Sequence, residues 1–598
     1  MKFAISQGGP SSTQETSSTE PKAFWMGKET ALLAFYHAPV QRSRQLAIVI
    51  CPSFGHEYLV AYQALRHLAI GLACQGFPVL RMDYAQTGDS FDIEDPTQIL
   101  STWKSNIKQA VLTVQEQSGL SKVCLIGLRW GALLATSVSE MVEIDSLVLI
   151  APVASGRSFV RELQVFHTMY LNRLQMDSSD HPCEVTGYDF PEVLQEQMKS
   201  LEFTKFEKIS AQHIFVIGRD DMPGSESRLL KHLDSLKLTL NLIHCPGYSA
   251  MMSQDSLHSK VPVLAWKAIE EALQHYAATV PASLPSAASF SSPVRTQAHF
   301  QETLISFQGK FGILTTPLVA SSSRYPAIVM SNIGVNHRAS NHRLYVQMAR
   351  HFATLGFTVL RMDRSGIGDS PARLGEDENI VYGAFGVQDT QDALDTLQTV
   401  YGFDKFILAG LCSGAYFAYQ TAIKDPRVVG LSLINILCFE WKHGDSLEIR
   451  QRRSIRSTEY YKRTAFNTST WLRLVKGKID ILSIARGLLQ RTGNRIQDLV
   501  KSLFGRLVEG QVPQSSVMQN LQTLLDRQVH IHFIVDSNDG AVDLLTESIA
   551  SKTKEFMKHP RFRIDTILGA DHTFTPRWSQ AWLLQIMSEY YQKHFTRF

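Results

Sequence analysis

The chain has 598 residues, of which 19% are charged and 44% apolar, and its formal net charge is +3. This length exceeds what one ordinary hydrophobic core supports, so we expect at least two domains. The near-neutral charge gives no general basis for binding nucleic acid. The seven cysteines form no CxxC pair, so they indicate neither a structural zinc site nor a disulfide framework.

Residues 1–21 are polar, rich in Ser, Thr and Gln, and lack the apolar core of a signal peptide. We expect this segment to be disordered. No window approaches the roughly 20 consecutive apolar residues that a membrane helix needs. These features predict a cytoplasmic protein without a membrane span, in a reducing compartment where a free thiol stays reduced.

Two stretches about 280 residues apart repeat the same pattern. An apolar strand, at 47–50 and again at 327–330, is followed by Gly-Phe-x-Val-Leu-Arg-Met-Asp and then Gly-Asp-Ser, which ends at Ser90 and Ser370. In both copies, short β-branched runs alternate with helical patterns. This alternation predicts an α/β fold, a mostly parallel sheet with helices on both faces and with function at the carboxyl ends of its strands.

Residues 277–296 hold three prolines, several serines and alanines and almost no charge, which is the composition of a linker. We therefore expect one domain at 22–276 and a second at 297–598. After its fifth strand, each copy inserts a helical stretch before the sheet resumes. In this architecture an insertion at that point usually forms a roof over the active site.

The second insertion, at about 445–512, is strongly basic. Residues 449–510 include fourteen Lys or Arg and four Asp or Glu. One interpretation is a solvated helix face. The other is a docking surface for an anionic group, such as an acyl-carrier protein and its phosphopantetheine arm, coenzyme A or an acidic glycan.

A sharp turn that could carry a nucleophile follows one strand in each copy. In the second copy the strand runs into Gly-x-Cys412-x-Gly and then into a helix. This is the form of the nucleophile elbow of α/β-hydrolases, in which the glycines leave room and the central side chain is exposed. Cys412 can attack a carbonyl, although a small buried apolar residue is the alternative interpretation. Ser413 is an alternative, since serine is the usual nucleophile, but it lies one residue past the apex, where its side chain points away from the site and its N–H suits an oxyanion hole.

The acid and the base of such an elbow follow it along the chain, in the order nucleophile, acid, histidine. One later strand ends in Asp-Ser-Asn-Asp-Gly, and the last strand ends in Gly-Ala-Asp-His. We expect Cys412 to be the nucleophile, His572 the general base and then acid, and Asp539 the residue that orients the imidazole. Asp536 and Asp571 are alternative acids.

The loop after the strand at 327–330 supplies the second oxyanion donor in this arrangement, and we assign it to the N–H of Val335, beside that of Ser413. The loop and the residues after it are rich in basic and titratable groups. We expect three of them to hold a carboxylate or phosphate of the substrate, unless they are ordinary surface charges: His337, Arg338 and Arg343.

The first copy lacks the residues for this chemistry. Arg129 stands at the apex of its elbow, and Ala250 occupies the place of the base. A guanidinium does not lose its proton, so it cannot act as a nucleophile. We expect Arg129 either to bind a carboxylate at the mouth of a degenerate site or to form a structural ion pair, with Asp220 or Asp221 as the partner.

The second copy resembles the serine-aminopeptidase-like branch of the α/β-hydrolases, and within it a bacterial group whose elbow reads Gly-Leu-Cys-Ser-Gly-Ala. The matching stretches are 332–338, 361–370 and 569–576. The first copy is similar to a group found with exosortase and exopolysaccharide systems, whose elbow also carries arginine, through 52–57 and 127–131. These resemblances imply two tandem α/β-hydrolase domains in a bacterial protein of hydrolase or acyltransferase type.

Together these features predict a cysteine-dependent acyl-transfer enzyme, either a thioesterase or esterase-type hydrolase or an acyltransferase. It would act on an acyl thioester or ester through an acyl-Cys412 intermediate, because thiolates attack such carbonyls readily. No metal or redox cofactor is implied. The alternative is a non-catalytic protein that binds an acyl or glycan group, or serves as a scaffold, in a biosynthetic or exopolysaccharide system.

Overall fold

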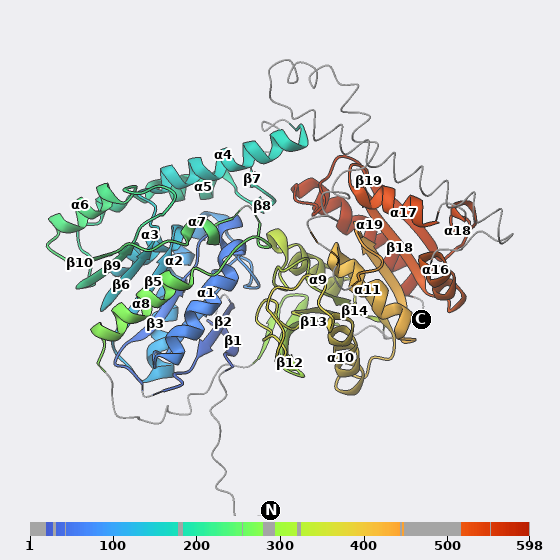
Figure 1. The fold of residues 1–598 in the computed structure, drawn as a ribbon, viewed down its shortest axis with the longest axis horizontal. Helices are drawn as coiled ribbons and strands as arrows, with labels where there is room; N and C mark the ends of the chain where they lie inside the picture. The colour runs from blue at the N-terminus through green and yellow to red at the C-terminus, as the bar shows by residue number, and fades with distance from the viewer. Residues whose placement is uncertain are drawn as a thin grey trace, which may run out of the picture.

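The structure, a computed structural model, describes residues 20–27, 31–41, 43–176, 183–253, 255–278, 293–319, 325–442, 445, 447, 516–549 and 552–596. Most of the N-terminal segment, most of the expected linker and nearly all of the expected basic insertion lie outside these residues. The described residues form two domains, each around one large sheet, that lie side by side (Figure 1).

The first domain has an eight-stranded sheet with the order β1-β2-β4-β3-β5-β6-β9-β10. β2 is antiparallel to β1 and β4, and every other neighbouring pair is parallel. The strands are β1 (Lys22–Met26), β2 (Leu32–His37), β3 (Ala47–Cys51), β4 (Val79–Met82), β5 (Val123–Leu128), β6 (Ser146–Ile150), β9 (His213–Ile217) and β10 (Thr239–Ile243).

Helices cover both faces of this sheet, with α1 and α8 in one core and α2 and α3 in the other. The helices are α1 (His56–Cys74), α2 (Ile99–Ser118), α3 (Trp130–Ser139), α6 (Ser227–Ser235), α7 (Tyr248–Met251), α8 (Val263–Tyr276) and the 3-10 helix η1 (Pro96–Gln98). The insertion between β6 and β9 consists of α4 (Gly156–Leu174), the hairpin β7 (Glu184–Val185) and β8 (Tyr188–Asp189), α5 (Glu192–Ser200) and η3 (Phe203–Lys205).

The second domain has a nine-stranded sheet with the order β11-β12-β13-β15-β14-β16-β17-β18-β19, antiparallel as far as β15 and parallel beyond it. β11 begins at Val294, within the stretch expected to be a linker. The strands are β11 (Val294–Gln297), β12 (Phe300–Phe307), β13 (Lys310–Pro317), β14 (Ala327–Met330), β15 (Val359–Met362), β16 (Phe406–Leu411), β17 (Val428–Ile434), β18 (His530–Asp536) and β19 (Phe562–Ile567).

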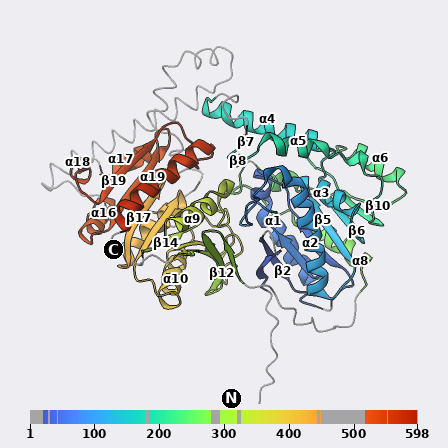
Figure 2. The same cartoon turned by 180° about the vertical axis from the view of Figure 1, so that it is seen from behind.

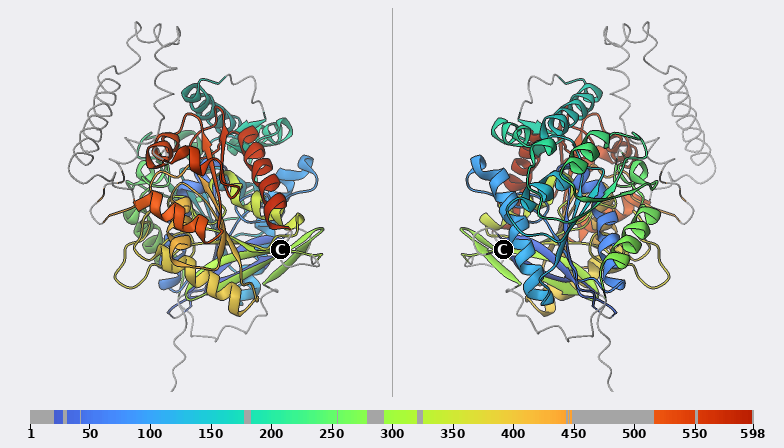
Figure 3. Two further views of the ribbon diagram at one scale, coloured as in Figure 1. Left: turned by 90° about the vertical axis from the view of Figure 1, so that its right-hand side faces the viewer. Right: turned by 90° about the vertical axis from the view of Figure 1, so that its left-hand side faces the viewer.

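The helices of the second domain also pack on both faces of its sheet, with α9 and α19 in one core and α10, α11, α16 and α17 in the other. They are η4 (Asn341–Arg343), α9 (Leu344–Thr354), α10 (Gly386–Thr399), α11 (Ser413–Lys424), α16 (Ser516–Asp526), α17 (Gly540–Ile549), α18 (Thr553–Phe556) and α19 (Arg577–Phe595). Figure 3 views the molecule from its two ends, with the second domain in front on the left and the first domain in front on the right.

The apolar runs of the central strands follow from this layering. Successive side chains of a strand point to opposite faces, so Val49 of β3 packs with α2 and α3, whereas Ile48 and Ile50 pack with α1 and α8. A strand covered on both sides must be apolar at nearly every position, and all six residues of β16 are buried. The predicted fold class, two tandem α/β-hydrolase domains, is confirmed.

The two domains meet through the antiparallel ends of their sheets. Trp25, Phe35 and Phe91 of the first domain share a hydrophobic cluster with Phe300 and Phe311 of the second. Phe35 and Phe311 meet edge to face with their ring centroids 5.4 Å apart. Because aromatic residues of both domains are buried in one cluster, the domains are held together by a shared core.

The repeated Arg-Met-Asp and Gly-Asp-Ser motif lies in this contact and is used reciprocally. Arg81 Nη2 pairs with Asp369 at 2.7 Å, and Arg361 pairs with Asp89. Each arginine therefore pairs with the aspartate of the other copy, as in a contact between two subunits related by a two-fold axis. All four side chains are buried.

Arg338 breaks this internal symmetry. The equivalent position of the first domain is Tyr58, whose hydroxyl donates to Asp83 at 2.7 Å. The guanidinium of Arg338 is wholly buried and contacts three aspartates at 2.6 to 2.9 Å, namely Asp89, Asp363 and Asp369. Since Asp89 comes from the first domain and the others from the second, Arg338 joins the two domains electrostatically.

Candidate active site

The turn between β16 and α11 presents Cys412. This residue has φ 57° and ψ −116°, a conformation that costs free energy for any residue with a side chain. A Cβ atom on Gly414 would lie 2.8 Å from Ser331 O, and one on Gly410 would lie 2.2 Å from the carbonyl carbon of Gly414. Both glycines are therefore needed for the close approach of backbone around the turn. The turn has the geometry of a nucleophile elbow.

Asp539 and His572 come together beside this turn. Asp539 follows β18, His572 follows β19, and Asp539 Oδ2 accepts a hydrogen bond from His572 Nδ1 at 2.7 Å. The other carboxylate oxygen accepts from Ala541 N at 2.8 Å, in the first turn of α17. A helix N-terminus stabilises a negative charge, so the carboxylate is held both by the imidazole and by the start of a helix.

The electrostatic surroundings favour the protonated form of His572. Burial lowers the pKa of His572, but the negative charges of Asp539 and Cys412 raise it, and the net pKa is well above the usual value. The influence of Cys412 shows that the thiol is near the ring. Nε2 of His572 is buried, and a hydrogen bond between the imidazole and Cys412 is among the causes that raise the pKa of His572. Catalytic hydrogen bonds are often long in the resting state and shorten when substrate binds.

The loop after β14 lies against the elbow. Ser413 Oγ accepts a hydrogen bond from Gly334 N at 2.9 Å, and the Ser413 side chain is buried. The N–H of Val335 donates to no acceptor among the residues that the structure describes. Ser413 is the first residue of α11, and the first N–H groups of a helix have no acceptor within the helix. Neither N–H group thus has a backbone acceptor among the described residues.

A cavity of about 510 Å³ adjoins these groups, within the range of roughly 300–1,000 Å³ that is typical of small-molecule sites. Cys412, His572 and Val335 all line it. The first domain also contributes to the lining, through His56, Leu59, Phe166, Met169, Tyr170, Arg173, Tyr188 and Leu257. The site is thus built from both domains.

The three basic residues expected to hold the substrate lie elsewhere. Arg338 is buried among aspartates in the domain contact. His337 is buried and stacks on the ring of Tyr62, with centroids 4.0 Å apart. Arg343 is also buried and donates to Gly88 O at 2.8 Å and Ser90 O at 2.7 Å. None of the three lines the cavity at Cys412, because all three are buried in the contact with the first domain.

The elbow of the first domain keeps its shape without a nucleophile. Arg129 has φ 53° and ψ −112°, nearly the values of Cys412. Its guanidinium is buried and pairs with Glu57 at 3.0 Å and with Glu162 of α4. The expected pairing with Asp220 or Asp221 is wrong.

The two aspartates have other partners, which explains the correction. Asp220 accepts hydrogen bonds from the backbone N–H of Gly247 and of Ser249, at 2.6 and 2.9 Å. Asp221 pairs with the neighbouring Arg219 at 2.8 Å. Ala250, at the position of the missing base, lies in α7 and is exposed.

The alternative acids, Asp536 and Asp571, do not contact His572 through an observed hydrogen bond. Asp536 is buried, and burial and the charge of Asp539 raise its pKa to about 8. Asp571 lines the cavity and accepts hydrogen bonds from Tyr170 Oη at 3.0 Å and from Thr575 N at 2.6 Å. Of the three aspartates, Asp539 is the one paired with the imidazole.

Sequence reasoning missed Asn435, which follows β17. Its Nδ2 donates to His572 O at 2.9 Å and its Oδ1 accepts from Asp536 N at 2.8 Å. This one amide therefore connects the loop of the base to the loop of the acid. A buried amide at the carboxyl end of a strand, in an otherwise apolar run, is the signal that could have revealed it.

Three expectations concern the basic insertion, metal binding and a membrane span. The basic insertion lies outside the described residues, apart from Asp445 and Leu447. Within the described ranges, no cluster of three or more His, Cys, Asp or Glu side chains is arranged to hold a metal ion. None of the described helices combines the length and apolarity that crossing a membrane requires.

The fold consists of two α/β-hydrolase domains, one with Cys412 at its elbow near the Asp539–His572 pair and one with Arg129 at its elbow. No family model matches the chain, and no curated protein matches its sequence. Membership of the two narrower groups, the one with the Gly-Leu-Cys-Ser-Gly-Ala elbow and the one found with exosortase systems, therefore stays a prediction from sequence.

Similar solved structures include an α/β serine hydrolase without a lid, XC6422 from Xanthomonas campestris, at 15% identity, covering 44% of this chain and 98% of that one, with a TM-score of 0.30. Est1E from Butyrivibrio proteoclasticus matches at 14% identity over 42% and 96% of the two chains, with a TM-score of 0.30. The thioesterase domain from the curacin biosynthetic pathway matches at 12% identity over 42% and 99%, with a TM-score of 0.28. These similarities concern the fold and carry no conclusion about activity.

Proposed function

We propose that the second domain is an acyl-transfer enzyme with cysteine as its nucleophile, acting on an acyl thioester or ester. The observation that supports this most strongly is the convergence of three features on one cavity. Cys412 stands at the strained apex of an elbow, the Asp539–His572 pair lies beside it, and the N–H group of Val335, which lines the same cavity, has no acceptor among the described residues. A structural cysteine needs none of these features.

In the first half-reaction the sulfur of Cys412 attacks the carbonyl carbon of the substrate. The carbonyl oxygen becomes an oxyanion, which accepts hydrogen bonds from the N–H groups of Val335 and Ser413. The carbon–sulfur or carbon–oxygen bond of the leaving group then breaks, and His572 gives its proton to the departing thiolate or alkoxide. The product is an acyl thioester on Cys412 and a neutral thiol or alcohol.

In the second half-reaction a water, alcohol or amine attacks the acyl-Cys412 carbonyl. His572 takes a proton from the attacking group, and the sulfur of Cys412 leaves as a thiolate beside the imidazolium. Asp539 stays ionised throughout and compensates the positive charge on the ring. Water as the acceptor makes the protein a thioesterase or esterase, and an alcohol or amine makes it an acyltransferase.

Thioesters and activated esters suit this site better than amides. The leaving group of a thioester departs readily as a thiolate, whereas an amine must be protonated before it leaves. Burial lowers the pKa of His572, but Asp539 and Cys412 raise it overall, and a protonated imidazole beside a cysteine favours the reactive thiolate form in general. An acyl thioester is therefore the substrate that we propose first.

Intact-mass analysis after incubation with acyl thioesters tests the proposal. Wild-type protein and the Ser413→Ala variant are expected to gain the mass of one acyl group, and Cys412→Ala is expected to gain none. Ser413→Ala tests the alternative nucleophile, because the hydroxyl is adjacent to the thiol; the variant also loses the hydrogen bond from Gly334 N, so it is expected to acylate more slowly but to reach the same mass. An adduct that persists in Cys412→Ala, or no adduct with any acyl donor, contradicts the proposal; the latter result favours a non-catalytic acyl- or glycan-binding protein.

A further inference from the structure

Helix α4 belongs to the first domain but reaches the active site of the second. It starts after β6 and runs along one side of the molecule toward the second domain, as Figure 1 and the view from behind in Figure 2 show. Its early residues Phe159, Val160 and Leu163 are buried in the core of the first domain. Its later residues Phe166, Met169, Tyr170 and Arg173 line the cavity at Cys412.

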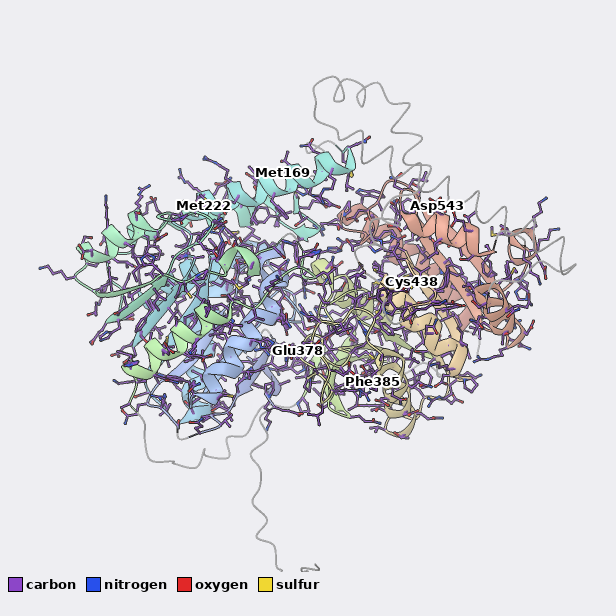
Figure 4. All side chains as sticks on the ribbon, in the orientation of Figure 1. Met169, Met222, Glu378, Phe385, Cys438 and Asp543 are labelled. Atoms are coloured by element: carbon purple, nitrogen blue, oxygen red, sulfur yellow. The ribbon has the colours of Figure 1, made fainter. Side chains whose placement is uncertain are left out.

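These four later residues lie on one face of the helix, because they stand three, four and seven positions from the first of them. Phe166 and Met169 are 37% and 66% exposed, which is unusual for two large apolar side chains on neighbouring turns. Met169 is labelled in Figure 4, on α4 at the upper side of the molecule. Phe166 packs on the ring of His56, with centroids 5.2 Å apart, and the face that Phe166 and Met169 form lines the cavity.

Part of the cavity continues this apolar face, whereas other lining residues, such as Asn336, Asn341 and Thr575, are polar. Leu59 and Leu257 of the first domain and Val335 and Val381 of the second also line it. A continuous apolar surface from α4 to Val335, beside a nucleophile, favours an acyl group with a hydrocarbon or aromatic chain over a short polar acid. With Cys412 on one wall and α4 on another, an acyl chain attached to the sulfur would extend between the two domains.

Side-chain contacts fix helix α4 on both sides of Phe166 and Met169. Glu162, one turn before Phe166, pairs with Arg129 at the former elbow of the first domain. Beyond it, Tyr170 Oη donates to Asp571 Oδ2 at 3.0 Å, in the residue before His572. The hairpin that follows α4 is also attached to the second domain, since Arg577 N donates to Glu184 Oε2 at 2.9 Å.

From this arrangement we infer that the first domain supplies the acyl-binding wall of the second domain's active site. The face of α4 that carries Phe166 and Met169 binds the apolar chain of the acyl group on Cys412. Arg129 is a positioning residue, because its ion pair with Glu162 fixes the position of α4 beside the cavity. This inference rests on the proposed function and names its substrate class, an acyl thioester or ester with a medium or long apolar chain.

The test compares rates of Cys412 acylation by acetyl, hexanoyl and decanoyl N-acetylcysteamine thioesters, followed by intact mass on full-length protein. We expect the wild-type rate to rise with chain length, because each buried methylene strengthens binding about fourfold. The double variant Phe166→Ala/Met169→Ala is expected to lower the ratio of decanoyl to acetyl rates about tenfold. Val165→Ala is the matched control, on the same turn, 53% exposed and outside the lining of the cavity.

A double variant that keeps the wild-type ratio, or that lowers all three rates equally, overturns the inference. Failure of the proposed function has a different signature, because wild-type protein would then form no adduct with any of the donors. Thermal melts of each variant exclude loss of folding as the cause of a changed ratio.

The positioning role of Arg129 is tested from its partner. Glu162→Gln keeps the size of the side chain and removes the ion pair, so we expect the decanoyl-to-acetyl ratio to fall at least threefold. Glu196→Gln on α5 is the control, since its ion pair with Lys199 at 2.7 Å is local and exposed. If the decanoyl-to-acetyl ratio of Glu162→Gln equals that of wild type, the positioning role of Arg129 is contradicted. The role of the apolar face is decided separately, by the Phe166→Ala/Met169→Ala variant.

Discussion

At the scale of single residues, the environment of Cys412 is more informative than its identity. A cysteine in a turn is common, but a residue with positive φ between two glycines that cannot accept a Cβ is held there at a cost. The surrounding structure over-determines this conformation. We interpret the strain as the means by which the thiol is presented to the cavity.

Asp539 is expected to matter through the imidazole. Replacing it by Asn removes the charge that stabilises the imidazolium while keeping the size of the side chain, so the acylation rate should fall by about 10²–10⁴-fold. Stopped-flow or quench-flow acylation with an acyl thioester measures this rate. Asp543→Asn, one turn further along α17, is the matched control. An Asp539→Asn variant within threefold of the wild-type rate contradicts the assigned role.

Asp536 gives a prediction about stability and pH. Its pKa in the folded protein is raised to about 8, from 3.8 in the unfolded chain, by burial and by Asp539. The folded state therefore binds more protons between pH 4 and 8, and this carboxyl group makes the protein less stable as the pH rises through that window. Asp536→Asn removes the titration, so the stability of the variant relative to wild type should increase from pH 5 to pH 8, by about 1–3 kcal/mol.

Thermal unfolding of wild type and Asp536→Asn at pH 5 and pH 8 measures this effect. The difference between their midpoints should be small at pH 5 and should favour the variant at pH 8. A difference that does not change with pH would show that Asp536 is ionised in the folded protein across the whole range.

The order of chemistry-bearing residues along the chain was enough to predict Cys412, Asp539 and His572 as one group, and the Asp539–His572 pair is present in the structure. The same sequence could not reveal that Arg338 and Arg343 take part in the contact between the two domains. Their partners Asp89 and Ser90 lie some 250 residues away, and a basic residue in a loop has the same appearance whether it binds a substrate or a neighbouring domain.

At the scale of elements, the junction of β14, β16 and α11 is the critical piece. The loop after β14 carries Val335, and Ser413 Oγ binds Gly334 N to hold that loop against α11. The sequence pattern of strand, Gly-x-Cys-x-Gly and helix predicted this junction because each part obeys a strong local rule. It did not predict that α4 would reach across to it, since an insertion of that length has many possible directions.

Gly414→Ala tests the junction. The new Cβ would stand 2.8 Å from Ser331 O and 3.2 Å from Asn332 O, so the loop after β14 must shift. We expect the acylation rate to fall about 10–1,000-fold through loss of oxyanion contacts, together with a destabilisation of about 1–3 kcal/mol. Gly383→Ala is the control, because the nearest atom to its Cβ is 3.8 Å away and its φ is not positive. Equal behaviour of the two variants in the acylation assay would contradict this account of the loop.

At the scale of the whole molecule, the two domains behave as a fused dimer whose halves have diverged. The repeated motif was predicted to mark two copies, and the structure shows that it also joins them, through Arg81 with Asp369 and Arg361 with Asp89. The exchange could not be inferred from sequence, because identical motifs are equally compatible with pairing inside each domain. Figure 4 labels Glu378 near the same junction, where it pairs with Arg66 at 2.6 Å.

Arg338 is expected to be essential for the stability of the contact between the two domains. Replacing it by Met would leave Asp89, Asp363 and Asp369 close together and buried without their shared cation, at a cost of about 3–5 kcal/mol. Calorimetry should show a lower unfolding midpoint. Arg228→Met is the control, because that side chain is 76% exposed and its contact with Glu202 is 3.6 Å long, so it should change stability by less than about 1 kcal/mol. Similar midpoints for the two variants would contradict the role of Arg338.

The chemistry at Cys412 can be tested directly by locating the bond that the substrate forms. Wild-type protein is quenched in acid within seconds of mixing with an acyl thioester, and the peptide that contains residues 412 and 413 is sequenced by mass spectrometry, with and without neutral hydroxylamine. We predict an acyl group on Cys412 that hydroxylamine removes, as a thioester requires. An acyl group on Ser413 that resists hydroxylamine, or an unmodified peptide while substrate is still consumed, would contradict a cysteine nucleophile.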